Sequence, residues 1–189
     1  MRRYHQSRFR QKKSIELPDL ELLDGVVSPV ILDALKKSSK QLDKANIRHA
    51  LIGGLAVGAY GHPRATRDVD YLVGDEAFKF HGGGLVTFNS QAPIAIGDVA
   101  VDLLGICEDE SYLNDGIEDA VLSGGIPIIS ISVLFYLKLK AFRSKDIGDL
   151  VELVKSGIDT DEVEDYLKCN AYAFLTRFKK IIRLASEEE

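Results

Sequence analysis

The sequence has few of the features that mark zinc, extracellular or membrane proteins. Its 189 residues include no tryptophan, one methionine and two cysteines. Cys107 and Cys169 lie far apart, and neither has a partner at the spacing of a zinc site, so we expect two thiols in a reducing cytoplasm. The four histidines form no HxxxH or HExxH pattern, so carboxylates would have to hold any metal. The longest nearly apolar run, residues 126–137, is too short to span a bilayer.

Acidic residues outnumber basic ones after the first thirteen positions of the chain. The net charge is −5, although the first thirteen residues carry six basic side chains and no acid. The net negative charge of the rest of the chain argues against a protein that binds nucleic acid over its whole surface. No apolar stretch follows the basic residues, so they are not expected to form a secretory signal. We interpret them as a tail or as a local contact for RNA or a partner; they are Arg2, Arg3, Arg8, Arg10, Lys12 and Lys13.

The apolar pattern changes character along the chain. Apolar residues make up 46% of it, enough for a buried core. Ser28 and Pro29 are typical of a helix start, and the periodicity predicts these elements: helices over 29–45, 55–60, 131–143, 146–156, 160–168 and 170–186, and strands over 48–52, 67–73, 85–88, 93–96, 99–106 and 126–129. We therefore expect an α/β (α+β) fold with a small, mixed, twisted sheet, flanking helices and a C-terminal helical bundle. The expected organisation is a tail and linker (1–25), an α/β core (26–129) and a helical region (130–189).

A glycine pair stands where a strand gives way to a helix. Gly53 and Gly54 follow an apolar strand, and glycine allows both a positive φ and the close approach of a bound group to the backbone. The N–H groups at a helix start can face a phosphate. A pair of glycines at such a place is more often only a tight turn.

Three aspartates form the pattern with the most chemical content. Asp68 and Asp70 alternate with apolar residues, so both carboxylates project from one face of a strand. Two carboxylates so close repel each other unless a cation lies between them, and Mg²⁺ prefers such oxygen ligands. An exposed edge strand with solvated acids is the alternative. Asp102 interrupts an apolar run and would complete a metal site from a neighbouring strand; Asp98, beside a turn glycine, is the competing candidate.

Together these residues resemble a known superfamily. The glycine pair, the pattern Arg64-x-Thr66-x-Asp68-x-Asp70 and the later Asp102 resemble the nucleotidyltransferase superfamily of DNA polymerase beta. Within it, the pattern is similar to the small bacterial group related to AbiEii-type toxins. Residues 138–149 resemble the helical motif of that group, and the resemblance spans about residues 48–153. The family often has serine where this chain has Gly54, so a hydroxyl that could contact phosphate is missing.

The resemblance implies a Mg²⁺-dependent enzyme that moves an NMP from an NTP to a hydroxyl. Asp68, Asp70 and Asp102 would hold two Mg²⁺ ions, or Mn²⁺, and take part in catalysis. The residues expected to bind the nucleotide are Gly53, Gly54, Arg64, Thr66, Lys138, Lys145 and Asp146. Arg64 and Thr66 would either contact phosphate or brace the strand. The acceptor would be the 3′ end of tRNA, as for a toxin with a cognate antitoxin, a protein, or a small-molecule hydroxyl.

Two further expectations concern the lysines and the rival functions. Lys138 and Lys145 lie seven residues apart, a spacing at which both ammonium groups can lie on one helix face. Solvated lysines near a helix C-terminus are the alternative.

A non-catalytic module that binds an NTP or a toxin–antitoxin partner would carry much of the same pattern, and it predicts binding without turnover.

Overall fold

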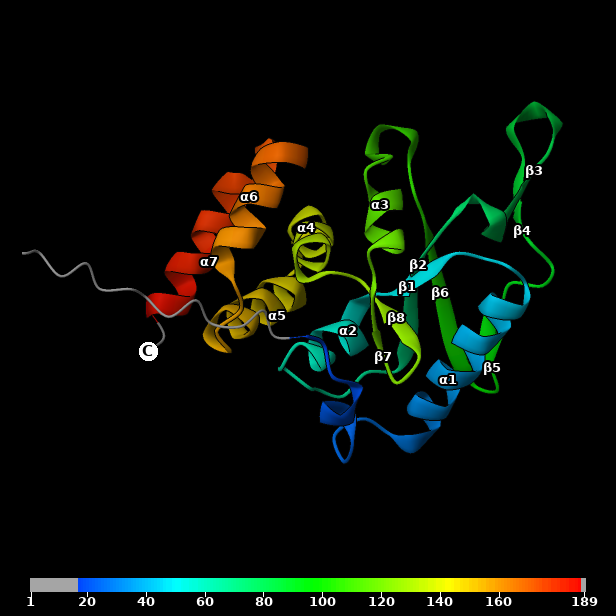
Figure 1. The fold of residues 1–189 in the computed structure, drawn as a ribbon, viewed down its shortest axis with the longest axis horizontal. Helices are drawn as coiled ribbons and strands as arrows, with labels where there is room; N and C mark the ends of the chain where they lie inside the picture. The colour runs from blue at the N-terminus through cyan, green and yellow to red at the C-terminus, as the bar shows by residue number, and fades with distance from the viewer. Residues whose placement is uncertain (1–16, 188–189) are drawn as a thin grey trace, which may run out of the picture.

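A mixed sheet of six strands forms the centre of the protein. The structure is a computed structural model that describes residues 17–187, so the basic residues near the N-terminus lie outside the described part. The strand order is β5-β6-β2-β1-β8-β7 (Figure 1). Its strands are β1 (His49–Leu51), β2 (Asp68–Val73), β5 (Ala95–Ile96), β6 (Val99–Gly105), β7 (Val121–Ser123) and β8 (Ile126–Ile128). β2 runs parallel to β6 and antiparallel to β1. The expected α/β class with a small mixed sheet is confirmed.

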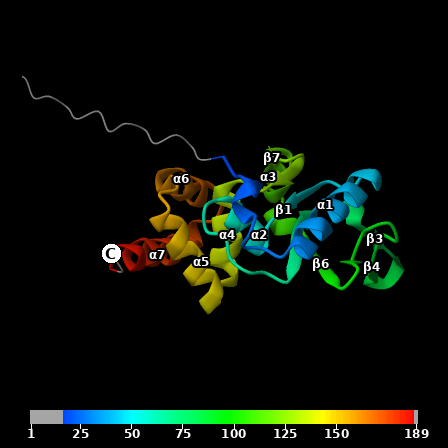
Figure 2. The same cartoon turned by 90° about the horizontal axis from the view of Figure 1, so that it is seen from below.

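A separate hairpin and a helical region lie at opposite ends of the molecule (Figures 1 and 2). The hairpin pairs β3 (Phe78–Phe80) with β4 (Val86–Phe88). The helices are α1 (Pro29–Lys44), α2 (Gly53–Ala59), α3 (Leu113–Glu118), α4 (Ile131–Ala141), α5 (Ser144–Lys155), α6 (Thr160–Asn170) and α7 (Leu175–Glu187). Helices α4 to α7 form the expected C-terminal helical region. None of the helices in the described part combines the length and hydropathy needed to cross a membrane.

The helix expected over 131–143 is shorter than its periodicity suggested. It ends at Ala141, because Phe142 adopts a left-handed backbone with φ of 49°. Helix α5 then begins at Ser144, with Arg143 as its N-cap residue. The expectation that Lys138 and Lys145 share a helix face was therefore wrong, since the two lysines lie on different helices.

The expected linker also contains structure. Residues Leu20–Leu23 form a short 3₁₀ helix, η1, and Leu23 is fully buried. A Cβ added at Gly58 of α2 would lie 2.4 Å from Leu23 Cδ2, so η1 packs closely on α2. A single buried cluster joins the sheet to α4, α5 and α7, as residues such as Leu51, Leu134 and Ile181 show. This continuous core fixes the helical region against the sheet.

Candidate active site

The three aspartates of the sequence pattern come together on the sheet. In the parallel pairing of β2 with β6, Asp70 lies opposite Asp102. Asp68 lies two residues before Asp70 and projects from the same face of β2, whereas Val69 and Tyr71 on the other face are buried. Carboxylate oxygens of the three aspartates all lie within 4.8 Å of one another. We call these three residues the acidic triad.

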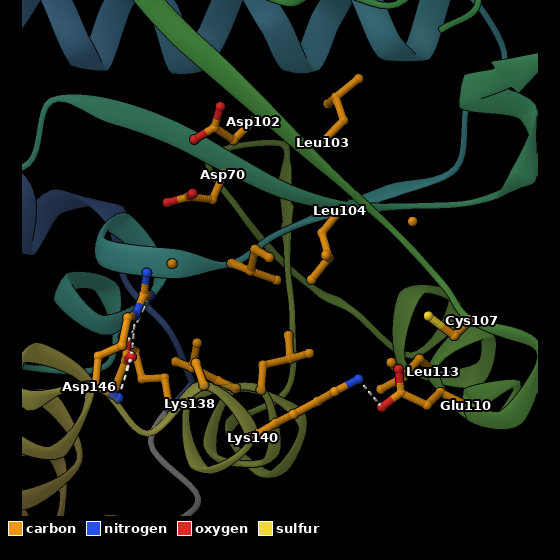
Figure 3. A pocket seen from close by; sticks show the side chains of 17 residues that line it. Asp70, Asp102, Leu103, Leu104, Cys107, Glu110, Leu113, Lys138, Lys140 and Asp146 are labelled. Carbon is orange, nitrogen blue, oxygen red and sulfur yellow. Dashed lines mark hydrogen bonds and ion pairs between the residues drawn. The ribbon is translucent and has the colours of Figure 1, made fainter. Parts of the chain in front are cut away.

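One expectation about Asp102 needs correction. The sequence suggested that its strand is buried, but β6 alternates between buried and exposed residues and Asp102 is exposed. Its side chain lies at the edge of a cavity, beside that of Asp70 (Figure 3). The rival Asp98 lies in the turn that joins β5 to β6 and is also exposed, but it is not part of the acidic triad.

The acidic triad lacks sufficient positive charge of its own. Burial, together with the charges of Asp68 and Asp102, raises the pKa of Asp70 from 3.8 to about 6. The ammonium of Lys138 and the backbone N–H of Gly54 act in the opposite direction but do not outweigh these effects. A divalent cation would relieve the repulsion, and three carboxylates form the oxygen-only donor set that Mg²⁺ and Mn²⁺ prefer. The donor set therefore fits the expected metal.

The glycine turn lies directly against this donor set. Gly53 begins α2 with φ of +67°, and a Cβ added there would lie 1.9 Å from Asp70 Oδ2. Any other residue would have to displace the carboxylate of Asp70. A Cβ at Gly54 would lie 3.1 Å from Arg64 Nη1 and 3.2 Å from Thr66 Oγ1. The glycine pair thus lets the turn approach both the acidic triad and the loop that precedes β2.

Arg64 and Thr66 hold other protein groups. Thr66 Oγ1 donates to Asp68 Oδ1 at 2.8 Å. The Arg64 guanidinium donates twice to Asp149, from Nε at 2.6 Å and from Nη2 at 2.7 Å. Sequence reasoning left open whether these two side chains contact phosphate or brace the strand. The Thr66 hydrogen bond holds a residue of β2, and the Arg64 hydrogen bonds tie the loop before β2 to α5.

Lys138 is buried in a network of charges between α4 and α5. Its side chain is nearly inaccessible, with a residue exposure of 6%, so the alternative of a solvated lysine is wrong. Its Nζ donates to Asp149 Oδ2 at 2.6 Å and to Asp146 Oδ1 at 3.3 Å. Asp146 Oδ2 also accepts from Arg143 Nε at 2.7 Å. We call Arg64, Lys138, Arg143, Asp146 and Asp149 the charge network.

Two members of the charge network were not among the predicted site residues. Asp149 is buried and joins Arg64 to Lys138, while Arg143 lines the cavity. The signal for Asp149 was present, because it lies on the same face of α5 as the buried Leu150 and Leu153, and an acid on an apolar face requires a partner. Lys145, by contrast, is exposed and is not one of the residues that line the cavity.

A cavity of about 600 Å³ extends from the acidic triad (Figure 3). Gly53, Asp70 and Asp102 lie at one end, and Cys107, Glu110 and Lys140 lie at the other. Its walls between the ends are largely leucine side chains. Ligand pockets in proteins commonly have volumes of about 300–1,000 Å³, so the cavity has the size of a site for a small molecule.

Comparison with known proteins gives little further information. No protein-family model and no curated protein matches the chain. Among solved structures, the fold is similar to that of an antigenic nucleotidyltransferase-like protein from Paracoccidioides brasiliensis, with 17% sequence identity and a TM-score of 0.40. The match covers 80% of this chain and 93% of the other. A likeness of this strength carries no argument about activity, which must come from the site itself.

Proposed function

We propose that the protein is a metal-dependent nucleotidyltransferase that moves an NMP from an NTP to a hydroxyl group and releases pyrophosphate. The observation that carries this proposal is the acidic triad, with Asp70 and Asp102 set opposite each other on adjacent parallel strands. Its carboxylates crowd together without enough positive charge, next to a turn at Gly53 where no side chain fits. This is the arrangement that two-metal phosphoryl transfer requires.

Each group at this end of the cavity has a defined task in the proposal. Asp68, Asp70 and Asp102 would hold two Mg²⁺ ions, which Mn²⁺ could replace. When bound, such ions would supply positive charge that stabilises the transition state of phosphoryl transfer. Asp102, the exposed member of the triad, accepts the proton of the acceptor hydroxyl. Thr66 orients Asp68 through its hydrogen bond, which keeps that carboxylate in place as the charge changes.

The charge network supports the reaction from the helical side. The ammonium of Lys138 partly opposes the rise in the pKa of Asp70. Asp146 and Asp149 hold this ammonium in place. Arg64, held by the same Asp149, lies against Gly54. In this proposal the network fixes the positions of two cations beside the triphosphate, and the glycine pair lets the triphosphate approach the backbone. Lys145 does not line the cavity, so its proposed contact with the nucleotide rests on the resemblance alone.

The finer proposal for the acceptor comes from the resemblance to AbiEii-type toxins. It names the 3′ end of tRNA as the acceptor and a cognate antitoxin as a partner, with protein and small-molecule hydroxyls as the other acceptors. The basic residues at positions 2–13 would hold RNA in that case. An acidic body predicts that any such binding weakens steeply with salt.

Incubation with each of the four NTPs, labelled at the α-phosphate, tests the proposal. The full chain is supplied with Mg²⁺, total RNA and total protein, and label is expected in one acceptor fraction and not after EDTA treatment. Asp68→Asn and Asp70→Asn should lose the transfer, whereas Asp98→Asn, an exposed turn variant, should retain it. Binding of NTP without transfer would favour the non-catalytic module, and retained transfer in both triad variants would refute the assignment.

A further inference from the structure

The end of the cavity remote from the acidic triad contains a pair of opposite charges. Lys140, in the last turn of α4, reaches Glu110 in the short 3₁₀ helix η4 (Glu108–Glu110). Its Nζ donates to Glu110 Oε1 at 2.6 Å, and the O–H of Tyr136 donates to the same oxygen. Figure 3 shows Lys140 extended towards Glu110, on the side of the cavity away from Asp70 and Asp102.

Both members of the pair are charged at neutral pH. Burial alone would raise the pKa of Glu110, but the hydrogen bonds from Lys140 and Tyr136 outweigh it and lower that pKa. The hydrogen bond to Glu110 raises the pKa of Lys140. Burial, reinforced by Glu110, raises the pKa of Tyr136, so its phenol stays protonated and donates. The pair therefore offers a group that only donates beside a group that only accepts.

The surroundings of the pair limit what can bind between the two ends of the cavity. Leu104 lies between the two ends and Leu113 beside Glu110 (Figure 3), and Leu134 and Leu137 also line the cavity. Leucine walls cannot replace the water around a phosphate, and burial of an unpaired anion there would be costly. They can pack against the faces of an aromatic ring. Glu110 has a residue exposure of only 8%, so a ligand that reached it would be largely removed from water.

The cavity thus presents three kinds of surface in sequence. Carboxylates suited to metal ions come first, then apolar walls, then a fixed donor–acceptor pair. A nucleoside triphosphate has the same order of chemistry, with a metal-binding phosphate chain, and a flat base whose faces are apolar and whose edge is polar. Lys140 uses one of its three N–H groups on Glu110, so its ammonium can still donate to a base.

We propose that Lys140 and Glu110 recognise the hydrogen-bonding edge of the NTP base and so determine which NTP the protein selects. Lys140 donates to a ring nitrogen or carbonyl oxygen of the base, and Glu110 accepts from its exocyclic amine or ring N–H. A base with the wrong pattern would set a donor against Lys140 or an acceptor against Glu110, and Glu110 is too buried for water to compensate, so the site discriminates between bases. This inference rests on the proposed function only for the position of the phosphates.

Binding constants for the four NTPs test the inference without an acceptor. Isothermal titration of the full chain, with Mg²⁺ present, is expected to show one NTP bound about tenfold or more tightly than the weakest. Lys140→Met and Glu110→Gln should each reduce the ratio of the weakest to the tightest Kd by about tenfold. The matched control is Lys168→Met on α6, which removes an ion pair to Asp165 at 3.0 Å. The side chains of Lys168 and Lys140 are equally exposed, at 47%, and the control should leave the ratio unchanged.

The possible results separate the inference from the function beneath it. If the wild-type chain binds no NTP, the proposed function itself fails. If it binds NTPs but the ratio is the same in wild type and both variants, or only the affinity for an acceptor changes, the inference is overturned. Should Lys140→Met fail to fold, Lys140→Arg keeps the charge but moves the donors. It is then expected to change the ratio, whereas Lys168→Arg is not, and an unchanged ratio in Lys140→Arg would overturn the inference.

Discussion

Two groups of acids lie on either side of the same cavity, and they differ in how their charges are balanced. On α5, Asp146 and Asp149 are both buried, yet each contacts cationic side chains. On β2 and β6, the carboxylates of the acidic triad lie within 4.8 Å of one another, and the charge of Lys138 does not outweigh the effect of this crowding on Asp70. For Asp146 and Asp149, hydrogen bonds and cations outweigh burial and lower the pKa, whereas burial and like charge raise the pKa of Asp70.

The contrast separates acids that stabilise the fold from acids that are suited to bind a cation. The cations of Asp146 and Asp149 belong to the chain, so these carboxylates stabilise the protein only while their partners remain. The acidic triad carries repulsion that the chain itself does not relieve, and a bound divalent ion would relieve it. The same residue type therefore performs two tasks, and the difference arises from the neighbours alone.

The largest effect is expected from removal of a buried acid of the charge network. Asp149→Ala leaves Arg64 and Lys138 without the carboxylate that holds both, and the loss of one partner from a buried ion pair costs about 3–5 kcal/mol. Chemical denaturation measures this change in the free energy of unfolding. Glu152→Gln on the same helix removes only a partly exposed pair with Lys155 and should cost about 1 kcal/mol or less. Equal costs for the two variants would show that the network is not structural.

Substitution of a glycine should test how closely the backbone holds the acidic triad. Gly25 and Gly53 both have positive φ, but a Cβ at Gly25 meets no atom within 4 Å, whereas one at Gly53 meets Asp70. Gly25→Ala should cost about 1–2 kcal/mol through its backbone alone. Gly53→Ala should cost roughly 1–3 kcal/mol more, because it displaces the carboxylate, and it should weaken metal binding. Thermal unfolding of the pair, with and without Mg²⁺, measures both effects; identical behaviour would contradict the close contact.

Addition of a divalent ion should stabilise the protein through the acidic triad. At a Mg²⁺ or Mn²⁺ concentration 100-fold above Kd, the expected gain in the free energy of unfolding is about 2.7 kcal/mol. Asp70→Asn should abolish most of this gain, and Asp98→Asn should keep it. The melting temperature, followed as the metal is titrated, provides the measurement. A gain that survives in Asp70→Asn would place the metal elsewhere.

The smallest effect concerns pH in the absence of metal. The pKa of Asp70 rises from 3.8 to about 6 on folding, so the folded state holds this proton more tightly than the unfolded state. The resulting penalty is absent below about pH 4, grows up to about pH 6 and is complete above it. With EDTA present, Asp70→Asn should therefore match wild type near pH 4 and exceed it near pH 7, by roughly 1–2 kcal/mol once solvent screening is allowed for. A constant difference between the two proteins across this range would argue against the raised pKa.

The sequence predicted most of the helices and strands and missed three short elements. The long helices and the strands that carry the acids were expected at nearly their observed positions, for example α1 and β2. The short elements β3, β7 and α3 were missed, whereas the equally short β4 and β8 were expected from their apolar residues. The predicted end of α4 lay two residues too late, because phenylalanine as a residue type does not indicate the left-handed backbone that Phe142 adopts.

In the candidate site, features that depend on neighbouring residues were predicted, whereas contacts between residues far apart in the sequence were not. Alternation along β2 was enough to put Asp68 and Asp70 on one face, and the glycine pair was recognised by residue type. Whether Lys138 was solvated or buried could not be decided, because its partners lie eight and eleven residues further along the chain, on another helix. The contact between Lys140 and Glu110 was not expected at all, since it joins residues thirty positions apart.

The sequence by itself determined which groups this protein can use. They are three aspartates, two of which share one face of a strand because side chains alternate along it, and a glycine pair without side chains. Those properties are local, because they follow from backbone geometry over a few residues. Tertiary structure alone decided that Asp102 lies opposite Asp70 and that Asp149 holds both Arg64 and Lys138. Pairing of strands and packing of helices bring distant residues within a few ångströms, and at that distance charge and burial, rather than residue type, set what each acid does.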